Sequence, residues 1–130
     1  MTRADVQRWL NQYVEAWKTY DRDQIAALFS ADAEYRYHPW DEPVRGREAI
    51  VDDWLAPDGD AARRDAEGTY DAWYEAWAVV GNRAVAVGTS DYFSDATHAT
   101  RERRYHNTYL LEFDADGRCR NFTENYQLER

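Results

Sequence analysis

Three side chains in this sequence combine acid–base chemistry with unusual positions: His38, Glu124 and Asp91. His38 closes a strand pattern, and an unperturbed imidazole titrates near pH ~6.5, so a histidine there can act as a general base near neutrality. A structural interpretation stands beside this one. In it, the imidazole of His38 only bonds a turn carboxylate, such as that of Asp41 or Glu42.

Glu124 alternates with Phe122 and Tyr126, and residues two apart share one face of a strand. A buried carboxylate without partners is costly, so Glu124 needs hydrogen-bond donors or a wet cavity. We expect it to line a pocket and to accept a hydrogen bond from Tyr35, Tyr37 or His38. Either Glu124 takes up a proton or orients a water, or it is a structural acid.

Asp91 and Glu75 are two further acids that alternate with apolar residues. The same two interpretations apply to Asp91, a catalytic partner of His38 or a structural acid. The alternation predicts an inward face of Trp73, Glu75, Trp77 and Val79 on one strand, and of Val85, Val87, Thr89, Asp91 and Phe93 on the next.

The last two strands show inward faces that are apolar at one end and polar at the other. These faces carry Tyr105, Asn107, Tyr109, Leu111 and Phe113 on one strand, and Phe122, Glu124, Tyr126 and Leu128 on the last. Polar groups among aromatic rings indicate a ligand pocket. The expected pocket walls are Tyr13, Trp17, Tyr35, Tyr37, Trp40, Trp54, Trp73, Trp77, Asn107, Tyr109, Phe122 and Tyr126.

The spacing of apolar residues along the sequence predicts the helices and strands that position these groups. Successive long strands are joined by short turns, at Gly81-Asn82 and at 114–117, which predicts antiparallel pairing. Asp21 is a suitable N-cap for the second of three helices. We expect helices over 3–18, 21–30 and 47–55, and strands over 33–38, 69–80, 83–93, 101–113 and 118–128. This order predicts one α+β domain over residues 1–130, with helices on one sheet face.

Composition excludes several classes of function. The formal net charge is −9, which argues against nucleic acid and anionic membranes as partners. A single cysteine, Cys119, rules out an internal disulfide. Without an apolar run of about 20 residues or a signal-peptide pattern, a cytoplasmic location is the expectation.

Motifs for cofactor or metal chemistry are also missing from the sequence. We find no Gly-rich phosphate loop, no Ser-His-Asp arrangement and no CxxC pair, so we expect cofactor-free chemistry. The three histidines, His38, His98 and His106, fall on a strand end, a loop and an outward strand face. Such positions do not converge, so we expect no metal site.

Two motifs resemble the SnoaL-like branch of the nuclear-transport-factor (NTF2-like) superfamily. The first runs from Tyr35-Arg36-Tyr37-His38-Pro39 into Pro43-Val44-Arg45-Gly46-Arg47-Glu48-Ala49-Ile50. The second joins the turn Asp116-Gly117-Arg118 to Phe122-Thr123-Glu124-Asn125-Tyr126. The resemblance covers essentially the whole chain. It implies a cone-shaped fold, in which a strongly curved antiparallel sheet wraps around the N-terminal helices.

Enzymes of this superfamily suggest roles for individual positions. Tyr35 and Glu124 match a tyrosine and a late-strand acid that hold water in limonene-epoxide hydrolases, whereas Tyr37 replaces their asparagine. Thr89 and Asp91 stand where those enzymes have Arg and Asp, so the Arg is missing. Ketosteroid isomerases have an aspartate base before a proline. Depending on the alignment, His38 or Tyr37 takes that place.

Two functions follow as hypotheses. The first is a cofactor-independent isomerase, cyclase, dehydratase or hydrolase that acts on a small, mostly apolar carbonyl or hydroxyl compound. The second is a noncatalytic binding or accessory module with the same pocket. We also expect a homodimer through the outward sheet face, because family members commonly pair sheet to sheet. That face would present Thr100, Glu102, Arg104, His106, Asn121, Thr123 and Asn125.

Overall fold

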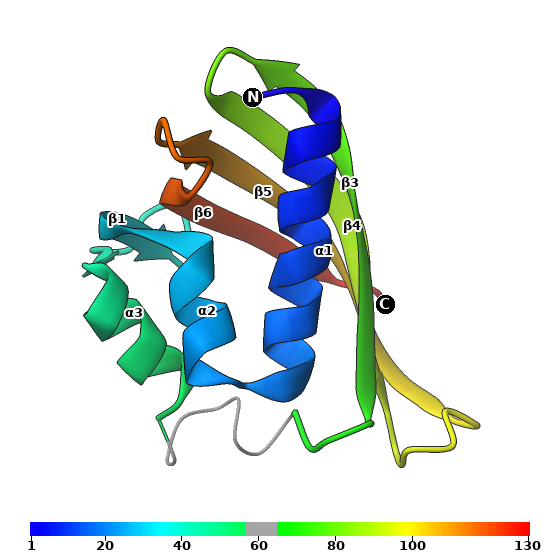
Figure 1. Ribbon diagram of the computed structural model, residues 1–130. Helices are drawn as coiled ribbons and strands as arrows, with labels where there is room; N and C mark the ends of the chain where they lie inside the picture. Colours follow the sequence, from blue (N-terminus) through cyan, green and yellow to red (C-terminus); the bar gives the residue numbers. More distant parts are fainter. Residues whose placement is uncertain (57–64) are drawn as a thin grey trace.

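A computed structural model describes residues 1–56 and 65–130 and shows an α+β fold of helices packed against one sheet (Figure 1). The described chain contains three helices and six strands. They are α1 (Arg3–Thr19), α2 (Arg22–Leu28), β1 (Phe29–Arg36), β2 (Val44–Arg45), α3 (Arg47–Trp54), β3 (Tyr70–Val80), β4 (Arg83–Phe93), β5 (Arg101–Phe113) and β6 (Cys119–Leu128).

The sheet has the strand order β2-β1-β6-β5-β4-β3 and is mixed, which corrects the expectation of a wholly antiparallel sheet. Strands β3 to β6 form the predicted antiparallel meander. Strand β1, however, pairs with β6 in parallel, with Tyr35 opposite Phe122. Short turns force antiparallel pairing only between consecutive strands, and β1 is far from β6 in sequence. This pairing brings the end of β1 beside the middle of β6.

Helix α1 is fixed at both ends and against the edge of the sheet. A capping box links Thr2 and Asp5 at its start, and Tyr20 ends it in a left-handed conformation. The side chain of Gln7 accepts a hydrogen bond from the backbone of Ala76 and donates one to that of Tyr74. The helix thereby satisfies part of the open edge of β3, and these bonds help to set the position of the apolar face of α1.

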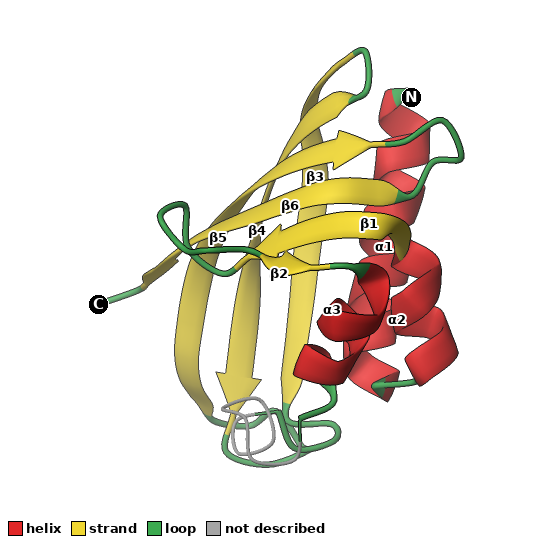
Figure 2. Ribbon diagram, turned by 90° about the vertical axis from the view of Figure 1, so that its left-hand side faces the viewer, coloured by secondary structure: helices red, strands yellow, loops and turns green. Residues whose placement is uncertain are grey.

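The sheet curves around α1, as Figure 2 shows from the side. Register shifts interrupt the β3–β4, β4–β5 and β5–β6 ladders, and such irregularities increase bend and twist. The core lies between the concave face and the helices, and Val6, Leu10, Phe29, Ile50 and Phe122 are all buried there. The family-like, curved α+β architecture expected from the sequence is confirmed, although the sheet is open.

The inward faces predicted for β3 and β4 are wrong, because each strand presents its other face to the core. Trp73 and Trp77 are 62% and 64% exposed on the outer face, whereas Tyr74 and Ala76 are buried. The prediction placed the Trp and Val side chains inward because they are more hydrophobic than their neighbours. The close approach of β3 and β4 instead requires the small residues on the inward face. A Cβ at Gly88 would lie 1.9 Å from the backbone oxygen of Trp73, so only glycine fits there.

The boundaries near α2 also differ from expectation. Asp21 caps the helix, and its carboxylate accepts a hydrogen bond from the backbone of Gln24, as predicted. The helix then ends at Leu28, and β1 begins at once with Phe29, so the strand starts four residues earlier than predicted. Among the described residues, no helix is both long and apolar enough to span a bilayer.

Candidate functional site

A cavity of about 360 Å³ opens between the helices and the concave face of the sheet. Its walls come from α1, α3, β1 and the four long strands, so residues distant in sequence meet there. The described lining consists of Tyr13, Trp17, Tyr20, Tyr35, Tyr37, His38, Asp53, Trp54, Ala56, Asp65, Tyr74, Ser90, Tyr92, Tyr105, Asn107, Tyr109, Glu124 and Tyr126. Most of these side chains are aromatic.

Tyrosines form the inner wall, and hydrogen bonds link several of their hydroxyl groups. The hydroxyl of Tyr109 donates to that of Tyr74 at 2.7 Å, and the amide of Asn107 donates to the same oxygen at 3.1 Å. The hydroxyls of Tyr13 and Tyr35 lie 3.4 Å apart. Burial raises the pKa of Tyr13, Tyr35 and Tyr109 well above the usual value, so these phenols stay neutral donors.

His38 is held by a tight turn that follows β1. The backbone N–H of Asp41 donates to the carbonyl of His38 at 3.0 Å, and Pro39 occupies the second turn position. The Asp41 carboxylate in turn accepts the backbone N–H of His38 at 3.1 Å and lies 2.8 Å from its Nδ1 atom. The carboxylate bond foreseen in the structural interpretation of His38 is thus present, and it fixes the ring.

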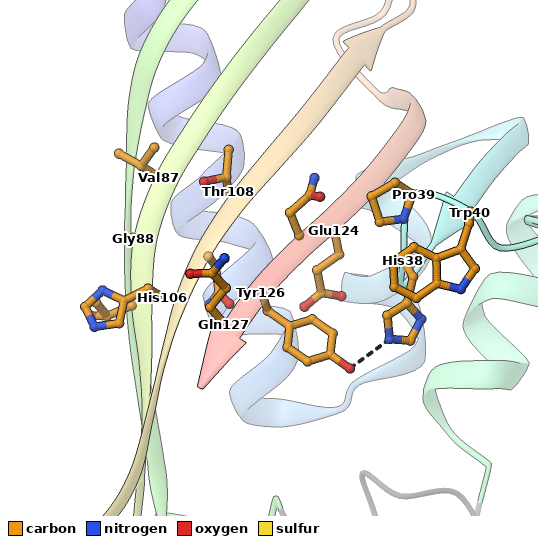
Figure 3. A pocket seen from close by; sticks show the side chains of 13 residues that line it. His38, Pro39, Trp40, Val87, Gly88, His106, Thr108, Glu124, Tyr126 and Gln127 are labelled. Atoms are coloured by element: carbon orange, nitrogen blue, oxygen red, sulfur yellow. Dashed lines mark hydrogen bonds between the residues drawn. The ribbon is translucent and has the colours of Figure 1, made fainter. Parts of the chain in front are cut away.

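The other ring nitrogen of His38 faces the cavity wall. Its Nε2 atom lies 2.9 Å from the hydroxyl of Tyr126 on β6 (Figure 3). A proton on Nδ1, toward the Asp41 carboxylate, leaves Nε2 of a neutral ring to accept the Tyr126 hydroxyl proton. In Figure 3, Glu124 projects from the same strand toward this pair. Asp41, His38 and Tyr126 therefore form a continuous hydrogen-bonded row that ends at the cavity.

A second hollow, a groove of about 530 Å³, adjoins the cavity beyond β6 (Figure 3). His38, Asn107, Glu124 and Tyr126 line both the groove and the cavity. Trp40 borders the groove, is 80% exposed, and stacks on the His38 ring with centroids 4.9 Å apart. The predicted pocket residue Trp40 thus covers the outer side of His38 rather than the cavity.

Glu124 lines the cavity, and its negative charge lies close to the phenols of the aromatic wall. Within the described parts of the chain, the bonds of Tyr37 and His38 go to Asp53, Asp41 and Tyr126. Tyr35 bonds Tyr13. Burial is the largest cause that raises the pKa of Tyr13, Tyr74 and Tyr109. The negative charge of Glu124 raises the same pKa values further. The charge of the Glu124 carboxylate therefore helps to keep these phenols protonated.

Asp91 does not join His38 and Glu124, which corrects its assignment as a catalytic partner. It lies on the outer face of β4, where both carboxylate oxygens bond the guanidinium of Arg104 at 2.6 and 3.0 Å. Trp73 and Trp77 share that outer face and do not line the cavity. Phe122 is fully buried behind the wall, stacked on Tyr35 with centroids 4.5 Å apart.

Several cavity residues escaped the sequence analysis. Because the prediction placed the wrong faces of β3 and β4 inward, it missed Ser90 and Tyr92 on β4 and Tyr74 on β3. The acids Asp53 and Asp65 also line the cavity, and they accept hydrogen bonds from tyrosine hydroxyls. The small residues Ala84, Ala86 and Gly88, alternating along β4, were the available sign that this face packs against large rings.

Comparisons with known proteins agree with the fold and motifs. The model of the SnoaL-like domain family matches residues 10–122, so the chain belongs to this family. A similar solved structure is an LEH-like epoxide hydrolase from M. tuberculosis, with a TM-score of 0.65 and 14% sequence identity over 96% of this chain and 84% of that one. A search of curated proteins gives no match. At this identity, the structural similarity establishes the NTF2-like fold alone.

Proposed function

We propose that the protein is a cofactor-independent acid–base enzyme acting on a small, mostly apolar carbonyl or hydroxyl compound. The observation that carries the proposal is the row Asp41–His38–Tyr126, which ends beside Glu124 in an aromatic cavity. Histidine is well suited to proton transfer near neutrality, and a carboxylate that orients it fixes the reactive nitrogen. An isomerase, cyclase, dehydratase or hydrolase reaction would use these groups.

The chemistry divides between the two ends of the cavity. Near β6, His38 exchanges a proton with the ligand directly or through the Tyr126 hydroxyl, and Glu124 accepts a proton or orients a water. Deeper in the cavity, the phenols whose pKa burial raises, such as Tyr35, remain protonated and can only donate hydrogen bonds to a ligand oxygen. Proton acceptors and fixed donors thus face one ligand from different sides.

A screen of small alicyclic and aromatic ketones, alcohols and epoxides tests this proposal. Ligands would be found by thermal shift, and turnover followed by mass spectrometry in H₂¹⁸O or D₂O. We expect His38→Gln and Glu124→Gln to retain binding within about threefold while reducing any turnover at least about 100-fold. Unchanged turnover in both variants would remove these side chains from the chemistry.

A noncatalytic binding module is the alternative, and one observation favours it. The deep hydroxyl group of Tyr74 already accepts hydrogen bonds from the Tyr109 hydroxyl and the Asn107 amide, which suits a rigid binding wall. A module of this kind would bind ligands from the same screen with no conversion. Its affinity would depend on wall residues such as Trp54 and not on His38.

A further inference from the structure

Asp65 contributes a carboxylate to the cavity and takes no part in the hydrogen-bonded row Asp41–His38–Tyr126. The Oδ2 atom of Asp65 accepts hydrogen bonds from the indole of Trp17 at 2.9 Å and from the hydroxyl of Tyr20 at 2.6 Å. Its other oxygen, Oδ1, is buried and has no hydrogen-bond partner in the part of the chain described. A carboxylate offers about four acceptor positions, so Asp65 retains unused capacity.

Aromatic rings surround this carboxylate. Trp17 and Tyr20 line the cavity with Asp65, and the ring of Tyr70 lies 4.4 Å from that of Trp17 between centroids. Burial is the largest cause that raises the pKa of Tyr20, and the hydrogen bond to Asp65 is the next. The phenol of Tyr20 therefore stays neutral. Neutral ring faces attract cations within about 6 Å, and an adjacent carboxylate strengthens that attraction in a desolvated site.

Among the described residues that line the cavity, acidic side chains outnumber basic ones. Asp53, Asp65 and Glu124 contribute carboxyl groups, whereas the described lining contains no Lys or Arg and only one histidine. Asp53 is bonded by the hydroxyl of Tyr37, so its charge sits against the aromatic wall as well. The whole chain carries a formal net charge of −9, which further raises the local concentration of cations.

We infer that this cavity selects ligands that carry an ammonium group, with the cation beside Asp65 and against the rings of Trp17 and Tyr20. The inference rests on the proposed function and narrows its substrate class to amino ketones, amino alcohols and related amines. The apolar part of such a ligand fills the cavity, and its oxygen extends toward His38. Asp65 then sets specificity, while His38 and Glu124 act on the other end.

Two compounds of matched shape test the inference: 2-phenylethylammonium and 2-phenylethanol, titrated by calorimetry and NMR at pH 7. We expect the ammonium compound to bind wild-type protein at least about tenfold more tightly. In Asp65→Asn the preference should fall to within about threefold, since shape is kept and charge is lost. Asp116→Asn removes a charge from an exposed turn and should keep the wild-type preference.

The outcomes separate this inference from the function on which it rests. If the alcohol binds wild type as tightly as the ammonium compound, the charge selection is overturned and a pocket for apolar compounds stands. An unchanged preference in Asp65→Asn overturns the assignment to Asp65. If neither compound binds at millimolar concentration, the small-molecule pocket and the inference both fail. The ratio of the two affinities measured with wild-type protein tests the charge selection even if Asp65→Asn does not fold.

Discussion

The Nε2 atom of His38 and the hydroxyl oxygen of Tyr126 lie 2.9 Å apart, although 88 positions separate the two residues in sequence. The parallel pairing of β1 with β6 makes this contact, because it places the turn after β1 beside the end of β6. Asp41 holds the opposite side of the ring at 2.8 Å. The fold therefore orients a histidine at a cavity whose other walls are mostly aromatic.

Asp41→Asn should release the ring of His38 while preserving the turn. The Asp41 carboxylate favours a proton on Nδ1, so wild type should show mainly the Nδ1–H tautomer of the neutral ring in long-range ¹H–¹⁵N NMR. We expect a mixture of tautomers in Asp41→Asn. Glu42→Gln, which changes the neighbouring acid, serves as control. An identical tautomer population in all three proteins would show that Asp41 does not orient His38.

Alkaline pH should unfold the protein through its buried tyrosines. Burial raises the pKa of Tyr13, Tyr35 and Tyr109 above 10, whereas in the unfolded chain these phenols ionise near 10. Their contribution is fully present below pH 10. It falls at higher pH because the unfolded state then binds fewer protons, by about 1.4 kcal/mol per pH unit for each group.

Urea unfolding between pH 9 and 12 measures this slope, and absorbance at 295 nm reports ionisation. Tyr109→Phe should reduce the slope by about one proton, or about 1.4 kcal/mol per pH unit. If all tyrosines of the folded protein ionise near pH 10, the wall is open to water and the prediction fails.

Gly88→Ala should be strongly destabilising. The added Cβ would meet the backbone oxygen of Trp73 at 1.9 Å and a ring carbon of Tyr74 at 2.5 Å, and backbone cannot move away cheaply. We expect a loss of about 3 kcal/mol or more in the free energy of unfolding by urea. Thr89→Ala, on the outer face next to it, should change stability by less than about 0.5 kcal/mol. Equal unfolding midpoints would contradict the close approach of β3 and β4.

The sequence predicted the helices, the meander and the inward faces of β5 and β6, because alternation there places most of the large apolar residues on one side. It failed on β3 and β4, where both faces offer apolar side chains and the small residues Ala86 and Gly88 point inward. It also missed the contact of His38 with Tyr126. That contact depends on a parallel pairing between distant strands, which local patterns do not encode.

The outer sheet face supports the proposal of a homodimer. Trp73, Trp77 and Leu110 are 62%, 64% and 49% exposed there, and exposed apolar side chains gathered on one face can mark a protein–protein interface. Light scattering at micromolar concentration should give twice the monomer mass, and Leu110→Lys should give a monomer. Asp116→Lys, on the β5–β6 turn, should remain dimeric. A wild-type monomer would rule the dimer out.

A crystal structure with acetophenone would locate a carbonyl oxygen relative to the proposed acid–base groups. We expect the ligand inside the aromatic cavity, with its oxygen within about 3.2 Å of the Tyr126 hydroxyl, of His38 Nε2 or of a water held by Glu124. An oxygen held only by Tyr74 and Asn107, or a ligand bound outside the cavity, would contradict an acid–base role for His38.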